Sequence, residues 1–297
     1  MMLLVAKKQK PARSNFLQTM IHGKRSNYSS IPINGYRMEG DKIIIREYTD
    51  PPMLNPIEQT YLISEVKGPI YRTFLLGTDR FGRDYLSQLV IGTRVSLSVG
   101  FISVLISLVI GIFIGSIGGF FRGWIDNIVV WFINVVWSIP TLLLVIAITF
   151  ALGKGFWQVF AAVGLTMWVE VARVVRGQIL SIREKEFVEA GRALGFSNFR
   201  IIFHHILPNV MSVVIVISAA NFASAILLEA GLSFLGIGVQ PPMPSWGSMI
   251  KENYGYIVLD SAYLAILPGF AIMLMVLAFM FVGNALRDAL DVKSSAG

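Results

Sequence analysis

The chain has 297 residues, of which 55% are hydrophobic and only 14% are charged, and its mean hydropathy is +0.66. Because soluble domains carry about 25% charged residues, an ordinary water-soluble globule is excluded. Residues 1–95 hold 14 Lys or Arg and 8 Asp or Glu, whereas the longer remainder, residues 96–297, holds only 11 and 10. The composition therefore predicts a membrane domain preceded by a polar segment.

Charge and residue counts remove several classes of function. The net charge of +7 would suit nucleic-acid binding, but basic residues also gather on the cytoplasmic loops of membrane proteins, and the high hydropathy favours that second explanation. The absence of cysteine removes disulfides, thiol catalysis and cysteine-based metal sites. The three histidines, His22, His204 and His205, do not form a pattern that could hold a metal. The sequence contains no phosphate-binding G-x-x-x-x-G-K-[ST] loop.

Residues 1–75 are interpreted as a polar extramembrane segment. Residues 1–6 are apolar but too short to span a membrane, and the basic residues follow them, whereas a signal peptide would begin with such residues. Turn signals such as Asn34-Gly35 and Pro51-Pro52 separate short β-like runs such as residues 43–45. The pattern predicts a small amount of β structure.

Five apolar stretches follow, each long enough to cross a hydrocarbon core of about 30 Å. They cover residues 96–118, 127–151, 157–180, 206–235 and 262–284. A backbone in lipid must satisfy its own hydrogen bonds, so these stretches are predicted to be helices. Pro140 is expected to interrupt the second and Pro268 the fifth, as membrane helices tolerate. The expected fold class is an all-α polytopic membrane protein.

The first stretch carries a small residue at every fourth position. These residues are Ser103, Ser107, Gly111, Gly115 and Gly119. Such a stripe allows a neighbouring helix to approach closely. Packing within the chain is the expected use, and a subunit interface is the alternative.

Lys and Arg are unevenly distributed around the predicted spans. Nine of them mark one side: Arg122, Arg173, Arg176, Arg183, Lys185, Arg192, Arg200, Arg287 and Lys293. After residue 95 the other side holds only Lys154 and Lys251. Because basic residues favour the cytoplasmic side, residues 119–126, residues 181–205 and the C-terminus are expected in the cytoplasm. The residues before position 96 are then expected outside.

The loop of residues 184–208 carries the clearest functional signal. Apolar residues at helical spacing predict a short amphipathic helix with one apolar face. That face consists of Phe187, Ala190, Gly191 and Leu194. A helix that lies on lipid would use bulky anchors, so the small Ala190 and Gly191 favour a groove in another protein.

The ends of this helix are also marked. Gly195 is a natural helix stop, because glycine adopts a left-handed conformation without strain. Ser197 is suited to cap a second short helix over residues 198–203. Pro208 comes near the start of the next span.

The loop resembles the signature E-A-A-x-x-x-G, nine residues, I-x-L-P of bacterial ABC-importer permeases, in which it docks on the ATPase. The matching positions are Glu189, Ala190, Gly195, Leu207 and Pro208. Gly191 stands for the second alanine, which keeps the face small, and His205 stands where isoleucine is usual.

The resemblance covers about residues 74–292 and is to C-type permeases of dipeptide and oligopeptide importers. It also rests on the motifs at residues 76–84 (LGTDRFGRD), 92–96, 172–177, 227–236, 241–247 and 286–291. It implies a type I ABC-importer permease fold, with residues 1–75 external, residues 76–292 as the transmembrane domain and residues 293–297 as a cytoplasmic tail.

The same resemblance implies a bacterial inner-membrane transport subunit that is not an enzyme. Its implied partners are a homologous permease, two ATPase subunits, which hold the ATP and Mg, and a periplasmic or lipid-anchored peptide-binding protein. No cofactor, metal or nucleic acid is expected on this chain. Nickel importers share these motifs and are the alternative within the family. An ion-coupled secondary transporter, the alternative from another class, would need inverted repeats and polar residues at mid-membrane.

Three polar residues within the apolar spans are candidates for the translocation path: Asn134, Asn221 and Glu229. An uncompensated charge at the position of Glu229 would cost at least about 2.5 kcal/mol, so a hydrogen-bonded tie is its alternative role. For Asn134 and Asn221 the alternative is bridging between helices. By contrast, Asp79 and Asp84 alternate with arginines and are expected to form a structural cluster at a helix start rather than a catalytic pair.

In the family that this chain resembles, the segment corresponding to residues 76–84 follows a first membrane helix and an external loop. The polar first third is therefore expected to be that loop in enlarged form. The first membrane helix of the family is expected to be missing from this chain. Residues 1–6 are expected to be either a remnant of the lost segment or a misassigned start of the protein.

Overall fold

The structure is a computed structural model. It describes residues 2–6, 28–48, 57–71, 73–153, 155–240, 243–258 and 261–291. It consists of two compact units, residues 1–94 and residues 95–297. The turn predicted at Pro51-Pro52 and the predicted tail of residues 293–297 lie outside the described residues.

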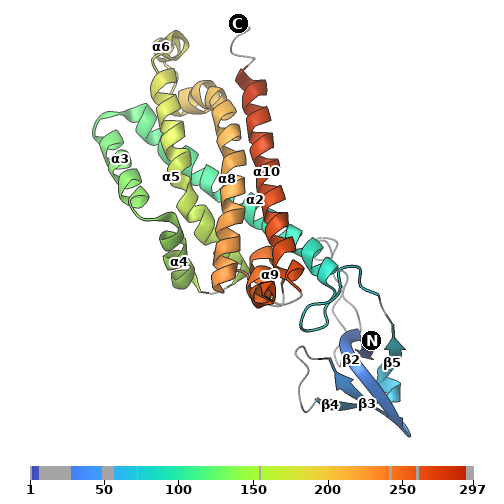
Figure 1. Cartoon of the computed structure of the whole chain (residues 1–297). Helices are drawn as coiled ribbons and strands as arrows, with labels where there is room; N and C mark the ends of the chain where they lie inside the picture. The colour runs from blue at the N-terminus through green and yellow to red at the C-terminus, as the bar shows by residue number, and fades with distance from the viewer. Residues whose placement is uncertain are drawn as a thin grey trace. The chain divides into compact units, whose positions relative to one another are not determined.

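The first unit contains a five-stranded antiparallel sheet (Figure 1). Its elements are β1 (Met2–Ala6), β2 (Tyr28–Glu39), β3 (Lys42–Glu47), β4 (Glu58–Leu62), the 3-10 turn η1 (Ile63–Glu65) and β5 (Val66–Ile70). The strand order is β4-β3-β2-β1-β5. β2 and β3 form a hairpin, and Gly40 in its turn takes a φ of +60°, which glycine adopts without strain.

Alternation of side chains gives this sheet one buried face. Ile43 and Ile45 of β3 are buried, whereas Ile44 between them is half-buried, as expected for a strand with one face covered. Leu3 and Ile33 complete the buried cluster. Residues 2–6 therefore form a strand between β2 and β5 in the sheet.

Asp79 organises the turn that precedes the first long helix. Its side chain is 3% exposed, and its Oδ1 accepts hydrogen bonds from the backbone N–H groups of Phe81 (2.9 Å) and Arg83 (2.8 Å). Its Oδ2 accepts from Arg83 Nε at 2.6 Å and from Gln88 Nε2 at 3.1 Å. The predicted ion pair with a neighbouring arginine is confirmed for Asp79.

Every regular element in the described part of the second unit is a helix. Its elements are α2 (Tyr85–Phe121, which begins in the first unit), α3 (Gly123–Trp137), α4 (Thr141–Leu152), α5 (Phe156–Ile182), α6 (Glu186–Ala193), α7 (Asn198–Arg200), the π-helix η2 (Ile201–Ile206), α8 (Leu207–Leu235), α9 (Trp246–Asn253), the 3-10 turn η3 (Tyr254–Ile257) and α10 (Tyr263–Asp291). Four helical segments in the described residues are long and apolar enough to cross a membrane, and a bent helix pair makes a fifth span if it counts as one. The prediction of an all-α membrane domain is confirmed.

The second predicted span is broken into two helices. The interruption expected at Pro140 is confirmed: α3 ends at Trp137 and α4 begins at Thr141, with an angle of 90° between them. Pro140 lacks the N–H group that would continue the helix. The interruption expected at Pro268 is wrong, because Pro268 lies inside α10 without ending it.

The stripe of small residues packs α2 against α5. A Cβ atom added to Gly111 would lie 2.5 Å from Val171 Cβ, and one added to Gly115 would lie 2.5 Å from the carbonyl oxygen of Ala172. Ser103 donates a hydrogen bond to the carbonyl of Phe160 at 3.1 Å. The expected use of the stripe, packing within the chain, is confirmed.

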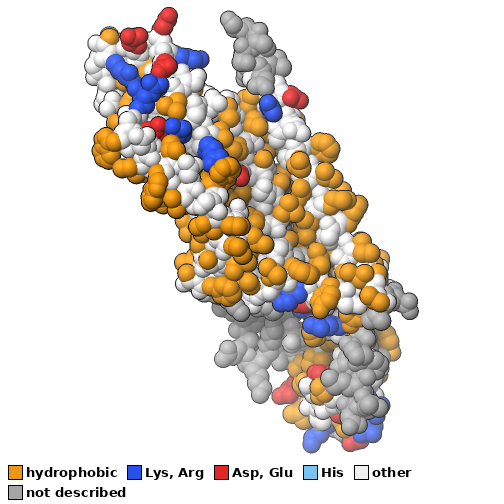
Figure 2. Space-filling view, turned by 60° about the vertical axis from the view of Figure 1, so that its left-hand side comes forward, with side chains coloured by type: hydrophobic (Ala, Val, Ile, Leu, Met, Phe, Trp, Pro, Cys, Tyr) orange, Lys and Arg blue, Asp and Glu red, His pale blue; other side chains and the backbone are white. Residues whose placement is uncertain are grey.

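Charged side chains gather at the end of the second unit that carries α6, beside a wide band of hydrophobic side chains (Figure 2). Two arginines that the sequence places with the cytoplasmic loops lie instead within α5. Arg176 forms a bidentate pair with Asp126 of α3 at 2.5 and 2.7 Å. Arg173 stacks over Trp137, 3.8 Å from the ring centroid. These contacts join α3 to α5.

The close contact of α2 and α5 predicts different effects for two identical substitutions. Gly115→Ala should lower the free energy of unfolding by about 1–3 kcal/mol, because its Cβ has no room beside the backbone of α5. Gly177→Ala is the control, since nothing lies within 4 Å of its added Cβ and alanine favours a helix by about 1 kcal/mol over glycine. Thermal unfolding of the purified protein in detergent measures both. Equal midpoints for the two variants would contradict the assigned packing.

Candidate functional site

The loop after α5 folds as two short helical segments joined by a tight turn. α6 ends in a Schellman motif, in which Gly195 takes a φ of +75° and donates its N–H to the Arg192 carbonyl at 2.9 Å. The N–H of Phe196 reaches the carbonyl of Gly191 at 3.0 Å. Ser197 caps α7 by accepting a hydrogen bond from the backbone of Arg200. Both helix boundaries follow the predicted signals.

Three of the four predicted apolar residues of α6 form an exposed face. Phe187 is 41% exposed and Leu194 is 72% exposed, and Ala190 lies exposed between them. Gly191 does not belong to this face. It is buried against Phe196 and Ile201, where an added Cβ would make only ordinary contacts of 3.4 and 3.8 Å. Its expected place on the apolar face is therefore wrong.

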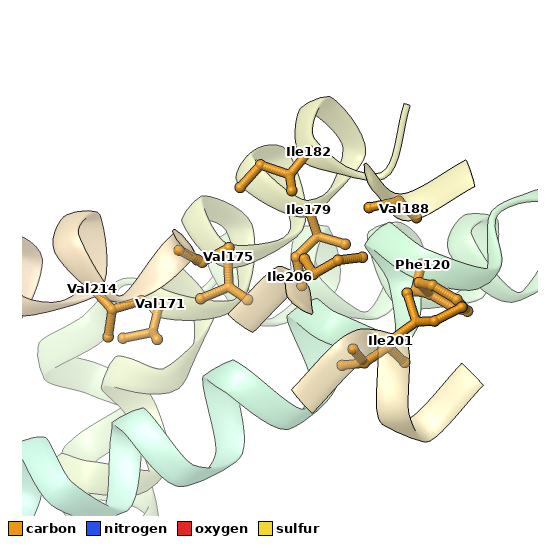
Figure 3. Packing of buried hydrophobic residues seen from close by; sticks show 11 residues of the cluster. Phe120, Val171, Val175, Ile179, Ile182, Val188, Ile201, Ile206 and Val214 are labelled. Carbon is orange, nitrogen blue, oxygen red and sulfur yellow. The ribbon is translucent and has the colours of Figure 1, made fainter. Parts of the chain in front are cut away.

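The anchor of α6, which sequence reasoning missed, is Val188. This side chain is fully buried, on the side of the helix turned away from the exposed face. It packs in one hydrophobic cluster with Phe120 of α2, Ile179 of α5 and Ile201 of η2 (Figure 3). A bulky aliphatic residue outside the apolar stripe of so short a helix is the signal that could have identified it.

Charged contacts also join the loop to the end of α2. Arg122 and Glu184 form an ion pair, and Arg183 donates a hydrogen bond to the carbonyl of Phe120. Burial lowers the pKa of Arg183, and the neighbouring Arg122 and Arg192 act in the same direction. Arginine nevertheless stays charged in proteins, so this end of the unit is basic.

The remaining predicted loop residues lie in and beside this assembly. Glu189 is exposed on α6. Leu207 and Pro208 begin α8, which continues directly from the π-helix η2. The exposed Phe199 and Phe203, whose ring centroids are 4.3 Å apart, are further apolar residues of the loop that the sequence pattern did not single out.

The three candidates for the translocation path do not share one surface. Asn134 is exposed on α3, whereas Asn221 and Glu229 of α8 are buried among the chain's own helices. Glu229 accepts a hydrogen bond from the Ser233 hydroxyl at 2.6 Å. This geometry supports a hydrogen-bonded tie as the role of Glu229.

The family is identified by similarity to known proteins. A model of the family "Binding-protein-dependent transport system inner membrane component" matches residues 96–295. The dipeptide transport system permease protein of Alkalihalophilus pseudofirmus is 42% identical over 217 residues, which cover 73% of this chain and 71% of that protein. The oligopeptide transport system permease protein of Haemophilus influenzae is 41% identical (73% and 70% covered), and a glutathione transport system permease protein of Pectobacterium atrosepticum is 40% identical (73% and 72% covered).

Solved structures support the fold. A chain of the MetNI methionine ABC transporter in an inward-facing conformation superposes with a TM-score of 0.58 at 21% identity, covering 69% of this chain and 97% of that chain. A chain of an amino acid ABC transporter superposes with a TM-score of 0.53 at 17% identity, covering 69% and 95%. The expected ABC-importer permease fold is thus confirmed. The chain belongs to the family of binding-protein-dependent transport system inner membrane components, and it is a multi-pass membrane protein of that family.

Proposed function

We propose that this chain is the permease subunit of an ATP-driven importer that carries dipeptides or oligopeptides across the bacterial inner membrane. The observation that carries the proposal is the exposed apolar face of α6, on a helix that Val188 joins to the membrane helices. The peptide substrate is supported by relatives of about 40% identity that are named as dipeptide and oligopeptide permeases. The experiment must distinguish this function from that of a nickel importer, the alternative within the family.

The exposed face of α6 is suited to a groove in a partner ATPase. Phe187 and Leu194 expose apolar surface that gains free energy when it is removed from water, at about 25 cal/mol per Å². Ala190 between them lets the partner's surface approach closely. The α6 face of this chain would bind one ATPase subunit. A homologous permease would present a second such face, which would bind the other ATPase subunit.

Coupling then follows from the rigid connection of α6 to the bundle. When ATP closes the ATPase pair, α6 moves with its groove, and the buried cluster around Val188 transmits the motion to α2, α5 and α8. The transporter thereby shifts between two packings, one open to each side of the membrane. ATP and Mg are held by the partner subunits, and this chain performs no covalent chemistry.

The proposed function is tested by uptake in bacteria from which the gene has been deleted. The native chain should restore uptake of a labelled dipeptide or tripeptide, whereas nickel uptake should stay at the level of the deletion strain. Glutathione is included because one relative carries its name. Dependence on ATP should persist when an uncoupler removes the ion gradient. If the native chain restores nickel uptake but not peptide uptake, the peptide assignment is contradicted. If the uncoupler stops transport while the cells still contain ATP, ATP-driven transport is contradicted.

The docking surface predicts the effect of a charge on α6. Leu194→Asp should reduce peptide uptake roughly tenfold or more, since truncation of an interface anchor often costs about 2 kcal/mol. The 72% exposure of Leu194 means that the protein itself should fold normally, so its amount in the membrane should not change. Leu194→Met is the matched control and should keep uptake. Normal uptake by Leu194→Asp would show that the exposed face of α6 is not the docking surface.

The proposed orientation, with the sheet outside and α6 and the C-terminus in the cytoplasm, predicts a labelling pattern. The native chain has no cysteine, so a single introduced thiol reports its own position. Met38→Cys in β2, where the side chain is 57% exposed, should react with a membrane-impermeant maleimide in spheroplasts. Asp288→Cys, at the exposed end of α10 and outside the proposed docking surface, should react only after the membrane is opened. The opposite pattern would invert the proposed topology.

A further inference from the structure

The break between α3 and α4 lies beside a cavity of about 310 Å³. Non-helical backbone at membrane depth is tolerated where it is buried in protein or lines a water-filled cavity. Trp137 at the end of α3 and Thr141 at the start of α4 both line this cavity. The volume is at the small end of ligand pockets, which span about 300–1,000 Å³, and so suits one end of a peptide rather than a whole one.

Glu170 supplies the acidic group of this cavity. It is the fifteenth of the 27 residues of α5, and therefore lies near the middle of an apolar span. Its side chain is exposed to the cavity, and within the described part of the chain it has no ion pair and no hydrogen bond. An ionisable group at such a depth is expensive and marks a transport pathway by default.

The two basic groups nearest along the same helix both have partners, and one of these partners, Trp137, itself lines the cavity. Arg173 stacks on Trp137, and Arg176 is paired with Asp126. The C-terminal end of α3, the negative end of its helix dipole, also borders the cavity. Thr166 and Ser224 add hydroxyl oxygens to the lining, and each hydroxyl donates its hydrogen to its own helix, which leaves lone pairs free. The cavity is therefore suited to a cation that carries hydrogen-bond donors.

A second cavity of about 580 Å³ is lined by α5, α8 and α10. Val174 and Gln178 follow Glu170 at intervals of four residues on α5, and Ala220 precedes Ser224 by four on α8. Val174, Gln178 and Ala220 line this second cavity, and Arg287 of α10 lines it as well. Residues four apart lie on one side of a helix, so the two cavities occupy one face of the helix pair.

We propose that Glu170 binds the terminal ammonium group of the peptide as it passes along the α5–α8 face. The inference rests on the proposed peptide-importer function and adds a substrate contact to it. An ammonium group has three donors, which match the carboxylate and the hydroxyl oxygens around it. This contact would select peptides with a free amino terminus within the membrane.

The test reverses the sign of the charge at position 170 while the labelled side chain keeps a similar size. Glu170→Cys is introduced into the native, cysteine-free chain, and the complete transporter is purified, labelled and reconstituted in liposomes. One sample carries a negative sulfonatoethyl thiosulfonate label and the other a positive trimethylammonioethyl label. Uptake is measured with alanyl-alanine, whose only positive charge is its terminal ammonium group. Asp288→Cys, at the exposed end of α10, is the control.

Glu170→Cys should lower uptake roughly tenfold or more, as expected when one partner of a desolvated charge pair is lost. The negative label should restore most of that loss, and the positive label should not. ATP hydrolysis stimulated by the loaded binding protein should stay close to the native rate, because docking is untouched. Neither label should change uptake by Asp288→Cys.

Equal uptake with both labels, or unchanged uptake by Glu170→Cys, would overturn the inference. If the homologous permease no longer copurifies with Glu170→Cys, the inference is also overturned, because Glu170 would then form a contact between the two permeases. If Glu170→Cys does not assemble, Ser224→Cys replaces it, and there the positive label should block uptake while the negative label spares it. The reverse or an equal effect would count against the inference. Absence of peptide uptake by the native transporter would instead contradict the proposed function.

Discussion

The contact between α2 and α5 sets the positions of the other helices in the second unit. Gly111 and Gly115 bring the two backbones together so closely that an added Cβ would lie 2.5 Å from atoms of α5. In lipid, helices gain little from hydrophobic burial against each other, so such close packing is the main source of their association. With α5 held this way, its C-terminal end carries the turn into α6 at a fixed place.

That fixed place explains how so short a helix can transmit force. α6 has only eight residues and would not be stable alone in water. Val188 inserts it into a cluster formed by α2, α5, η2 and α8, while the Gly195 turn leads the chain directly back into that cluster. The outer face remains free for a partner. One side of the helix thus belongs to the bundle and the other to the proposed ATPase interface.

Local signals in the sequence predicted the parts of this site that depend on neighbouring residues alone. Gly195 and Ser197 mark their turn and cap because a left-handed conformation and a side-chain acceptor are local requirements. The orientation of Gly191 was not predictable in this way, since which side of α6 is covered depends on Phe196 and Ile201 after the turn. Likewise β1 becomes a strand because β2 and β5 pair with it from more than twenty residues away.

The break at Pro140 shows the same limit and has a functional consequence. Pro268 has the same chemistry and leaves α10 continuous, so proline alone does not decide between a tolerated defect and a 90° break. At Pro140 the surrounding helices leave a cavity that the freed backbone can line, and Glu170 faces that cavity from α5. Without a polar occupant, an acidic side chain and a broken helix at this depth would both lower stability. Their coincidence at one place is therefore better explained by a transported polar group than by packing.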